Sequence, residues 1–197
     1  MRTAGLNLKE SGLREGSMSP GQDLIMAGFA GLEGTVRIAG QRRAELECRF
    51  CTAFLKQLEV PDGPSPLNWA KEHAGIHITA YEAVAEGGVL AALWNLSGTF
   101  CAGIEFDLRK IPVRQVTVEV CELYGLNPYR LLSGDAFVAA ADNGGRAVEA
   151  LLRLGIEAAV IGRVIPGTDR RISHGGEPAG YLERPQPDEY LRVGNVE

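Results

Sequence analysis

The sequence predicts a single α+β domain, and three observations support that class. The chain has 197 residues, which lies within the roughly 100–200 residues of one domain. Segments with strand and helix character alternate along it, without a linker or an internal repeat. Apolar residues make up 45% and charged residues 23%, as in ordinary globular chains. We therefore expect residues 1–21 to form a polar tether and residues 22–197 to form the domain.

The expected strands are short runs of apolar residues bounded by glycine or polar residues. Period-two alternation supports the strand after Cys101, and paired glycines at Gly175-Gly176 predict the turn of a β-hairpin near the C-terminus. The other strands are expected at Asp23–Ala27, His77–Tyr81, Ala136–Ala141 and Ala158–Val164.

The expected helices follow apolar residues that recur every third or fourth position. One helical region runs from Leu32 to Leu58, with a break at Gly40. Ser65 and Pro66 supply an N-cap and a first-turn proline for a short helix. Further helices are expected after Gly88, over Arg114–Tyr124 and over Gly145–Leu154.

Charge and hydropathy argue against two classes of binding protein. Acidic residues number 25 against 20 basic ones, for a net charge of −5, so we expect no nucleic-acid partner. Apolar runs such as Val89–Trp94 are far shorter than the ~20 residues that cross a bilayer, so we expect no membrane insertion. The N-terminus lacks the apolar core of a secretory signal. The 4 cysteines are too few for a fold of this size that is stabilised by disulfide bonds. A cytoplasmic location is the simplest expectation.

Three evenly spaced glycines follow the first expected strand: Gly28, Gly31 and Gly34. A glycine-rich turn that enters a helix can present backbone N–H groups to an anion. The dinucleotide fingerprint has a different spacing and an acidic residue at the end of the next strand, whereas Glu45 and Glu47 fall inside a predicted helix. We interpret the glycines as a turn needed for close packing, with an anion contact as the alternative.

The segment Glu86-Gly87-Gly88 is the stronger candidate for an anion site. Two glycines at the start of a helix leave backbone donors exposed, and the helix dipole favours a phosphate or carboxylate there. Two interpretations remain open with equal weight. The segment is either a packing turn or a loop that binds a ligand.

We expect no metal site. Cys48-x-x-Cys51 and His73-x-x-x-His77 have a superficial likeness to zinc ligands, but the intervening 21 residues are more than such sites use. Cys51 shares an apolar stripe with Phe54, where a free cysteine acts as a small hydrophobic residue. We therefore interpret both cysteines as buried and structural.

No catalytic residue is expected either. The histidines are scattered over different elements, and nothing places any of them near a nucleophile. Arg109-Lys110 and Arg170-Arg171 are short basic pairs. We interpret them as solvated surface, with a phosphate or partner contact as the alternative.

Six segments in register carry a resemblance over nearly the whole chain, from about Gly21 to Val193. They are GLEGTVRIA (31–39), EGGVLAALWNLSG (86–98), GIEFDLRKIPVRQ (103–115), CELYGLNPYRLLSGDAF (121–137), GIEAAVIGRV (155–164) and LERPQPDEY (182–190). Together they resemble the C-terminal domain of the aminoimidazole-ribonucleotide (AIR) synthase, or PurM-related, superfamily, and most of all its HypE-like branch. The resemblance implies a three-layer α/β/α domain with partial ferredoxin-like topology.

The resemblance also implies that the loop at Gly87 and Gly88 faces a nucleotide cleft between two halves of the enzyme, with ATP and magnesium bound by an N-terminal half. Residues 1–22 are too few to encode such a half. The superfamily's Asp and Thr before the paired glycines are replaced by Ala83 and Ala85, and HypE's essential Glu by Ser133. HypE also ends in a cysteine, whereas this chain ends VGNVE.

These departures predict a stand-alone, non-catalytic module that binds a ligand or a partner. The alternative is one subunit of a split ATP-dependent enzyme of the AIR synthase or hydrogenase-maturation type, whose nucleotide-binding half is another chain. We expect no cofactor, with Mg-ATP bound only if a partner supplies that half. A surface that would otherwise pack against the half needs covering, so we expect a homodimer or a separate partner protein.

Overall fold

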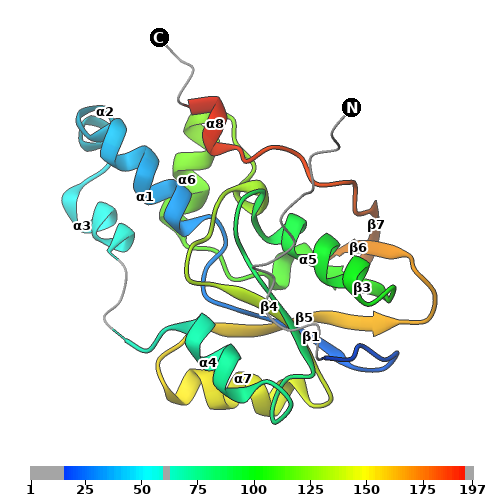
Figure 1. Ribbon diagram of the computed structural model, residues 1–197. Coiled ribbons are helices and arrows are strands. Elements are labelled where there is room, and N and C mark those ends of the chain that lie inside the picture. The colour runs from blue at the N-terminus through cyan, green and yellow to red at the C-terminus, as the bar shows by residue number, and fades with distance from the viewer. Residues whose placement is uncertain (1–15, 60–62, 194–197) are drawn as a thin grey trace, which may run out of the picture.

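A mixed sheet forms the centre of the molecule, as the computed structural model in Figure 1 shows; residues 16–59 and 63–193 are described. The sheet has 7 strands in the order β2-β4-β1-β5-β3-β6-β7. Neighbouring strands are antiparallel except β3 and β6, which are parallel. The strands are β1 (Asp23–Ala27), β2 (Ala80–Ala83), β3 (Gly103–Asp107), β4 (Phe137–Ala141), β5 (Ala158–Ile165), β6 (Arg170–His174) and β7 (Glu177–Tyr181).

Helices cover both faces of the sheet and also form a group at one end. α5 lies on one face and α4 and α7 lie on the other, while α1, α2, α3, α6 and α8 gather at the upper left in Figure 1. The α-helices are α1 (Leu32–Gln41), α2 (Arg43–Arg49), α3 (Thr52–Leu55), α4 (Pro66–His73), α5 (Gly88–Thr99), α6 (Gln115–Tyr124), α7 (Gly144–Arg153) and α8 (Tyr190–Val193). Short 3-10 turns are η1 (Lys56–Leu58), η2 (Leu108–Lys110) and η3 (Pro128–Arg130).

Three apolar clusters hold these layers together. Leu24, Leu93 and Phe106 belong to the cluster between the sheet and α5. A second cluster between the sheet and α4 and α7 includes Trp69 and Phe137. The third joins α1, α2, α6 and α8 away from the sheet. Burial on both faces explains why β4 is buried along its whole length, and it confirms the expected three-layer α+β class.

Most expected elements are confirmed, including Ser65 as the N-cap of α4, where its hydroxyl accepts the Asn68 N–H. The second expected strand begins later, at Ala80, because the backbone N–H groups of Ile76 and His77 still donate to His73 in the turn that ends α4. Most of the expected tether, residues 1–15, lies outside the described residues.

Two expectations for the helical region from Leu32 to Leu58 are wrong: the position of its break, and the burial of Cys48 and Cys51. The first break lies at Arg42 instead of Gly40, and a second lies at Phe50 and Cys51, whose backbones are extended. The second break removes Cys51 from the stripe. Cys48 and Cys51 are therefore exposed, whereas Cys121 of α6 is buried.

Candidate functional site

The two glycine segments singled out in the sequence approach the same stretch of chain, residues 128–133, from two sides. A Cβ at Gly31 would lie 2.8 Å from the Pro128 carbonyl oxygen, and one at Gly34 would lie 2.4 Å from Leu131 Cγ. From the α5 side, a Cβ at Gly88 would lie 2.5 Å from the Tyr129 carbonyl oxygen. Side chains at these positions would collide with the stretch, so close packing alone requires glycine there.

The backbone N–H groups of the first glycine segment are used inside the protein. Gly28 donates to the Glu157 carbonyl at 2.8 Å, and Gly34 donates to the Leu132 carbonyl at 2.8 Å. Gly31 donates to Ser133 Oγ at 2.9 Å. These bonds favour the packing interpretation of the segment, and the anion contact stays a prediction.

Ser133 stands where the resemblance puts the essential Glu of HypE, and its side chain is buried. Its hydroxyl accepts the Gly31 N–H just before α1 and lies 3.4 Å from the Leu131 carbonyl oxygen, to which it can donate. The residue therefore fastens the stretch 128–133 to the start of α1.

The second glycine segment is paired with a carboxylate from the chain itself. Gly87 donates its N–H to Asp188 Oδ2 at 2.9 Å, and the other carboxylate oxygen accepts the Tyr190 N–H at 2.9 Å. Asp188 is buried, and the Gly88 N–H donates to the Ala85 carbonyl. Glu86, the third member of the segment, is exposed. The position that sequence reasoning offered to a ligand's phosphate or carboxylate thus holds the Asp188 side chain.

A hollow of about 430 Å³ opens beside Ala83, Val84 and Ala85. Its other walls come from α1, from the first turns of α4 and from Gly134-Asp135. The hollow therefore gathers the two replaced positions, Ala83 and Ala85, with the neighbours of Ser133. The other lining residues are Glu33, Arg37, Ser65, Leu67, Asn68, Lys71 and Leu132.

Most charged groups of the hollow are already paired. Glu33 forms an ion pair with Arg37 one turn later. Asp135 accepts hydrogen bonds from Ser65 Oγ at 2.9 Å and from the Leu67 N–H at 3.0 Å, which caps the start of α4. The hollow can offer polar contacts to a ligand or a partner side chain, since Lys71 is exposed at its wall.

Glu82 precedes the replaced positions but belongs to the other face of β2. Its carboxyl bonds with the Asn95 side chain of α5, and burial raises its pKa while that bond opposes the rise. Glu82 therefore does not line the hollow.

Three carboxylates at helix starts were missed by sequence reasoning: Asp188, Asp135 and Asp23. Asp23 Oδ2 accepts the Gly144 N–H at 2.8 Å where α7 begins. The only local signal was at Asp188, two residues before the N–H of Tyr190 that it accepts, a spacing typical of an Asx-turn. No spacing in the sequence points to the distant donors.

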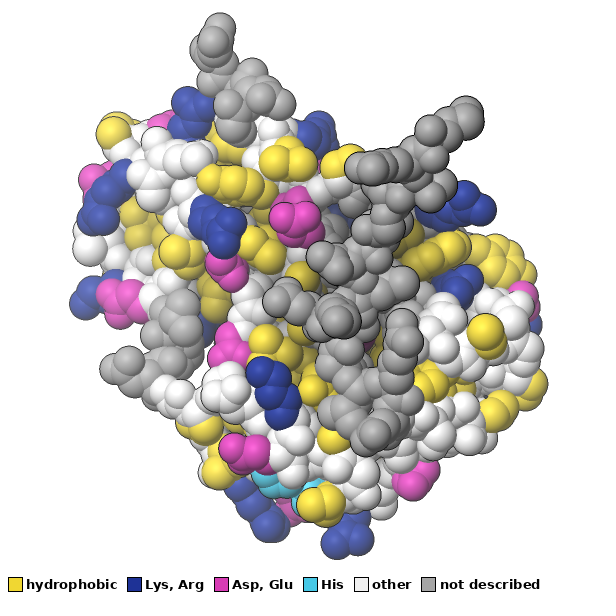
Figure 2. All heavy atoms as spheres, viewed as in Figure 1, with side chains coloured by type: hydrophobic (Ala, Val, Ile, Leu, Met, Phe, Trp, Pro, Cys, Tyr) yellow, Lys and Arg dark blue, Asp and Glu magenta, His cyan; other side chains and the backbone are white. Residues whose placement is uncertain are grey.

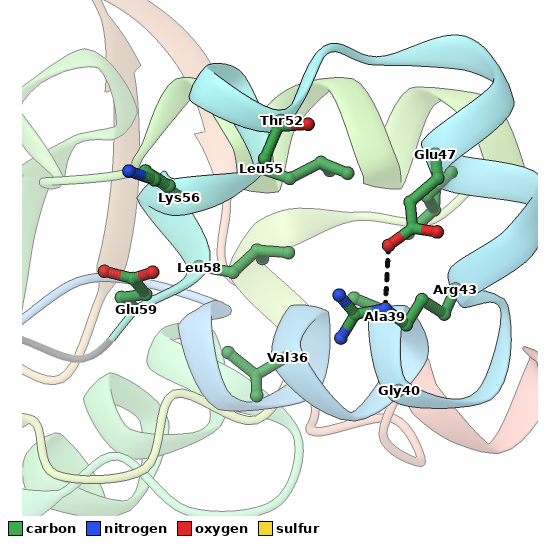
Figure 3. Close-up of a pocket in the computed structure, with 11 residues that line it drawn as sticks. Val36, Ala39, Gly40, Arg43, Glu47, Thr52, Leu55, Lys56, Leu58 and Glu59 are labelled. Carbon is green, nitrogen blue, oxygen red and sulfur yellow. Dashed lines mark hydrogen bonds and ion pairs between the residues drawn. The ribbon is translucent and has the colours of Figure 1, made fainter.

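A groove of about 410 Å³ lies between α1, α2 and α3 (Figure 3). Val36, Leu55 and Leu58 point into it, and the Arg43–Glu47 ion pair stands on its rim. Its lining also includes Thr52, Lys56 and Glu59. The groove therefore combines aliphatic side chains with polar and charged ones.

The supposed zinc ligands are not brought together. His73 stacks on Trp69 with ring centroids 4.4 Å apart, and His77 lies 5.6 Å from His73. Figure 2 shows histidine side chains near the lower end, over α4 and α7, whereas α2 and α3 occupy the upper left of the same view in Figure 1. Among the described residues, no group of three or more His, Cys, Asp or Glu side chains could hold a metal ion.

Of the basic pair at the start of β6, one member is not solvated surface as expected. The Arg170 guanidinium lies 4.0 Å above the Trp94 ring of α5, and its Nε is buried. Arg171 faces solvent and pairs with Asp169 at 2.9 Å. No helix in the described part of the chain is long and apolar enough to span a bilayer.

Comparison with known sequences gives one informative relative. The sequence matches no protein-family model. Over 114 residues it is 33% identical to the phosphoribosylformylglycinamidine synthase subunit PurL of Thermosynechococcus vestitus, a match that covers 55% of this chain and 12% of that protein.

Solved structures show a closer likeness in fold. E. coli HypE, a hydrogenase maturation protein, matches with a TM-score of 0.67 and 22% identity over 91% of this chain and 54% of that one. A chain of the HypE–HypF complex matches with a TM-score of 0.68 and 21% identity, over 87% and 55% of the two chains. Thiamine-monophosphate kinase from Stenotrophomonas maltophilia matches with a TM-score of 0.60 and 19% identity, over 85% and 54%. The chain thus spans about half the length of these proteins and a small part of PurL.

Proposed function

Because the chain has the fold of the PurM-like superfamily in its HypE-like form, we propose that it is a non-catalytic module that binds a ligand or a partner protein. The observation that carries the proposal is the Asp188 carboxylate on the Gly87 N–H. A phosphate at the same helix start would meet that negative charge instead of free donors.

The residues of the hollow do not fit Mg-ATP. Phosphoryl transfer needs a metal and cationic groups to stabilise the charge of the transferred group. Ala83 and Ala85 provide no metal ligand, and the carboxylates of Glu33 and Asp135 are engaged by Arg37 and by the start of α4. One solved HypE structure is a complex with ATP, and this chain departs from the superfamily pattern at the hollow.

A partner is the better fit. HypE has been solved in complex with HypF, so a protein of this fold assembles with another protein. The hollow and the groove between α1, α2 and α3 each combine aliphatic side chains with charged side chains of both signs. A second copy or a separate partner protein fits these surfaces, and the proposal places the module in the cytoplasm, where its thiols stay reduced.

Isothermal titration calorimetry with Mg-ATP tests the proposal on the purified chain. We expect no saturable heat and no release of phosphate. A Kd below about 10 μM would overturn the non-catalytic assignment.

A second experiment tests the split-enzyme alternative. The chain is titrated with the nucleotide-binding half of E. coli HypE, and Mg-ATP binding is measured again on the mixture. We expect the affinity of that half for Mg-ATP to be unchanged. Phosphate release that requires both polypeptides would favour the split enzyme.

A further inference from the structure

Among the described residues, helices cover only part of one face of the sheet. α4 and α7 pack against β4, β1 and the first half of β5, where Ala158 and Val160 belong to the second cluster. The residues of β7 are exposed along the whole strand. Toward the β7 edge, none of the three apolar clusters of the described residues lies on this face, which carries charged side chains and the Tyr181 ring.

A row of four side chains crosses this uncovered face, one from each strand. The strand register pairs Glu105 with Arg163 and with Arg171 on its two sides. Arg171 is in turn paired with Tyr181 of the edge strand. Directly paired residues point to the same face of a sheet, so the row reads Arg163, Glu105, Arg171, Tyr181. We call these four residues the charge row.

The charge row is open to solvent. The side chains of Arg163 and Glu105 are 66% and 33% exposed, and that of Arg171 is 52% exposed. Tyr181 is among the exposed large hydrophobic residues, at 67%. Arg163 Nη2 contacts Glu105 at 3.2 Å and Arg171 Nη2 contacts Asp169 at 2.9 Å. Because a guanidinium has five N–H donors, each arginine keeps donors for a further acceptor.

Two copies of the charge row are complementary when they face each other and run in opposite directions. A two-fold axis parallel to the strands places the row against a reversed copy of itself. Glu105 then faces Arg171 of the second copy, and Arg163 faces Tyr181 of the second copy, where a guanidinium can stack on the ring. A two-fold axis perpendicular to the strands instead sets each arginine against itself. Charge therefore selects one arrangement out of two.

We propose that the face formed by β3, β6, β7 and the Arg163 end of β5 binds the same face of a second copy of this chain, with the charge rows reversed. Isologous contacts of this kind are the commonest route to a homodimer. The sheets would stack about 10 Å apart with strands aligned to within about 30°. The four residues of the charge row line neither the hollow nor the groove, so the interface goes beyond the proposed function and does not depend on it.

The size of the face sets the strength of the dimer. Strands lie about 4.8 Å apart and rise about 3.3 Å per residue, so the row is roughly 14 Å long. Such a patch is smaller than the ~800 Å² that each partner buries in a stable complex. We therefore expect a weak dimer whose association depends on charge.

Paired charge reversals test the arrangement by sedimentation equilibrium at about 0.1 M salt. Glu105→Arg leaves arginines facing arginines, and Arg171→Glu leaves carboxylates facing carboxylates, so each variant alone should raise the Kd at least tenfold or so. An equimolar mixture restores both facing pairs and should dimerise as the wild type does. Net charge cannot explain dimerisation in the mixture. The wild type carries −5 and both variants also remain negative, so their net charges repel each other.

Matched measurements keep each outcome decisive. Arg49→Glu on α2 reverses an exposed charge that lines neither the hollow nor the groove, and it should leave the Kd unchanged. Circular dichroism confirms that each variant is folded. The wild-type dimer should also weaken between about 0.1 M and 1 M salt, as the Debye length falls from about 10 Å to 3 Å, a test that needs no variant. A wild type that stays monomeric at several hundred micromolar, or a mixture no more dimeric than its components, would overturn the proposal.

Discussion

The Asp188 carboxylate accepts the backbone N–H of Gly87 at 2.9 Å, although 101 positions separate the two residues in the chain. The contact joins the segment before α8 to the start of α5. It gives a buried carboxylate the donors that a helix N-terminus leaves unpaired. Asp135 at α4 and Asp23 at α7 repeat the arrangement. The helix starts around the sheet are thus stabilised by carboxylates of the chain itself.

Replacing Asp188 by alanine should lower the free energy of unfolding by about 1–3 kcal/mol, because the buried N–H of Gly87 and the partly buried N–H of Tyr190 lose their acceptor. Asp188→Asn keeps one acceptor oxygen and should lose less. Urea denaturation followed by circular dichroism measures both values. Glu183→Ala, which removes an exposed ion pair with Arg130, is the control and should change the stability by less than about 0.5 kcal/mol.

The same variants test whether the start of α5 is an anion site. If Asp188 fills that site, millimolar inorganic phosphate should raise the melting temperature of Asp188→Ala more than that of the wild type. An equal response of the two proteins would mean that the Gly87 segment has only a packing role.

Two glycines of α1 provide a matched pair for the packing interpretation of the first segment. Gly34→Ala introduces a Cβ 2.4 Å from Leu131 Cγ, whereas Gly40→Ala meets nothing within 4 Å. We expect Gly34→Ala to destabilise by about 1–3 kcal/mol through overpacking. Gly40→Ala should stabilise by up to about 1 kcal/mol through helix propensity. Thermal denaturation of both variants and the wild type measures these changes in stability. A Gly34→Ala protein as stable as the wild type would contradict the close-packing argument.

Thiol reactivity should separate the four cysteines into two classes. Cys48, Cys51 and Cys101 are exposed, whereas Cys121 is buried. Burial, with a smaller contribution from the Glu189 charge, raises the pKa of Cys121 to about 12, and the thiolate is the reactive form. Native protein at pH 8 should therefore release three equivalents of thionitrobenzoate rapidly, and the fourth only after unfolding. Cys121→Ser should abolish the slow equivalent; its persistence in that variant would contradict the assignment.

The fold could be predicted from the sequence where local signals agree. Ser65-Pro66 marks the start of α4, and Gly175-Gly176 marks the turn between β6 and β7. The break between α2 and α3 could not be predicted from the sequence. The spacing of Leu46, Phe50 and Phe54 fits one continuous helix as well as two separate helices. The backbone of Phe50 and Cys51 is extended, and Phe50 and Phe54 pack on the cluster that α6 and α8 help to form. No short window of sequence contains those helices.

The candidate site shows the same division. Gly87 and Gly88 could be predicted to sit at a helix start with exposed backbone donors, and the Gly87 N–H donates to Asp188 of the chain itself; binding of a ligand's anion there stays a prediction. Its origin in Asp188 could not be predicted, because the two residues meet only when the last described segment crosses to α5. Long-range contacts of this kind depend on the completed fold, while glycine spacing reports only local backbone.

Acid should loosen the β6–β7 hairpin before it unfolds the rest of the protein. Asp107 at the end of β3 accepts N–H groups from Arg109 at 2.9 Å and from Gly175 and Gly176, in the hairpin turn, at 3.1 and 3.0 Å. These bonds, with the one from Arg109 the largest cause, hold the pKa of Asp107 below its usual value.

A depressed pKa fixes the direction of the pH effect. The unfolded chain takes up the proton near pH 3.9 or so, and the folded protein takes it up only at lower pH. The contribution of Asp107 to stability is therefore complete above that unfolded value and is lost as pH falls through the lower, folded one. Amide hydrogen exchange at Gly175 and Gly176 should accelerate relative to that of the central strand β4 over this range. Asp107→Asn carries no titrating carboxyl and should show no such acceleration. Equal pH dependence in the two proteins would mean that another group, and not Asp107, fastens the hairpin to β3.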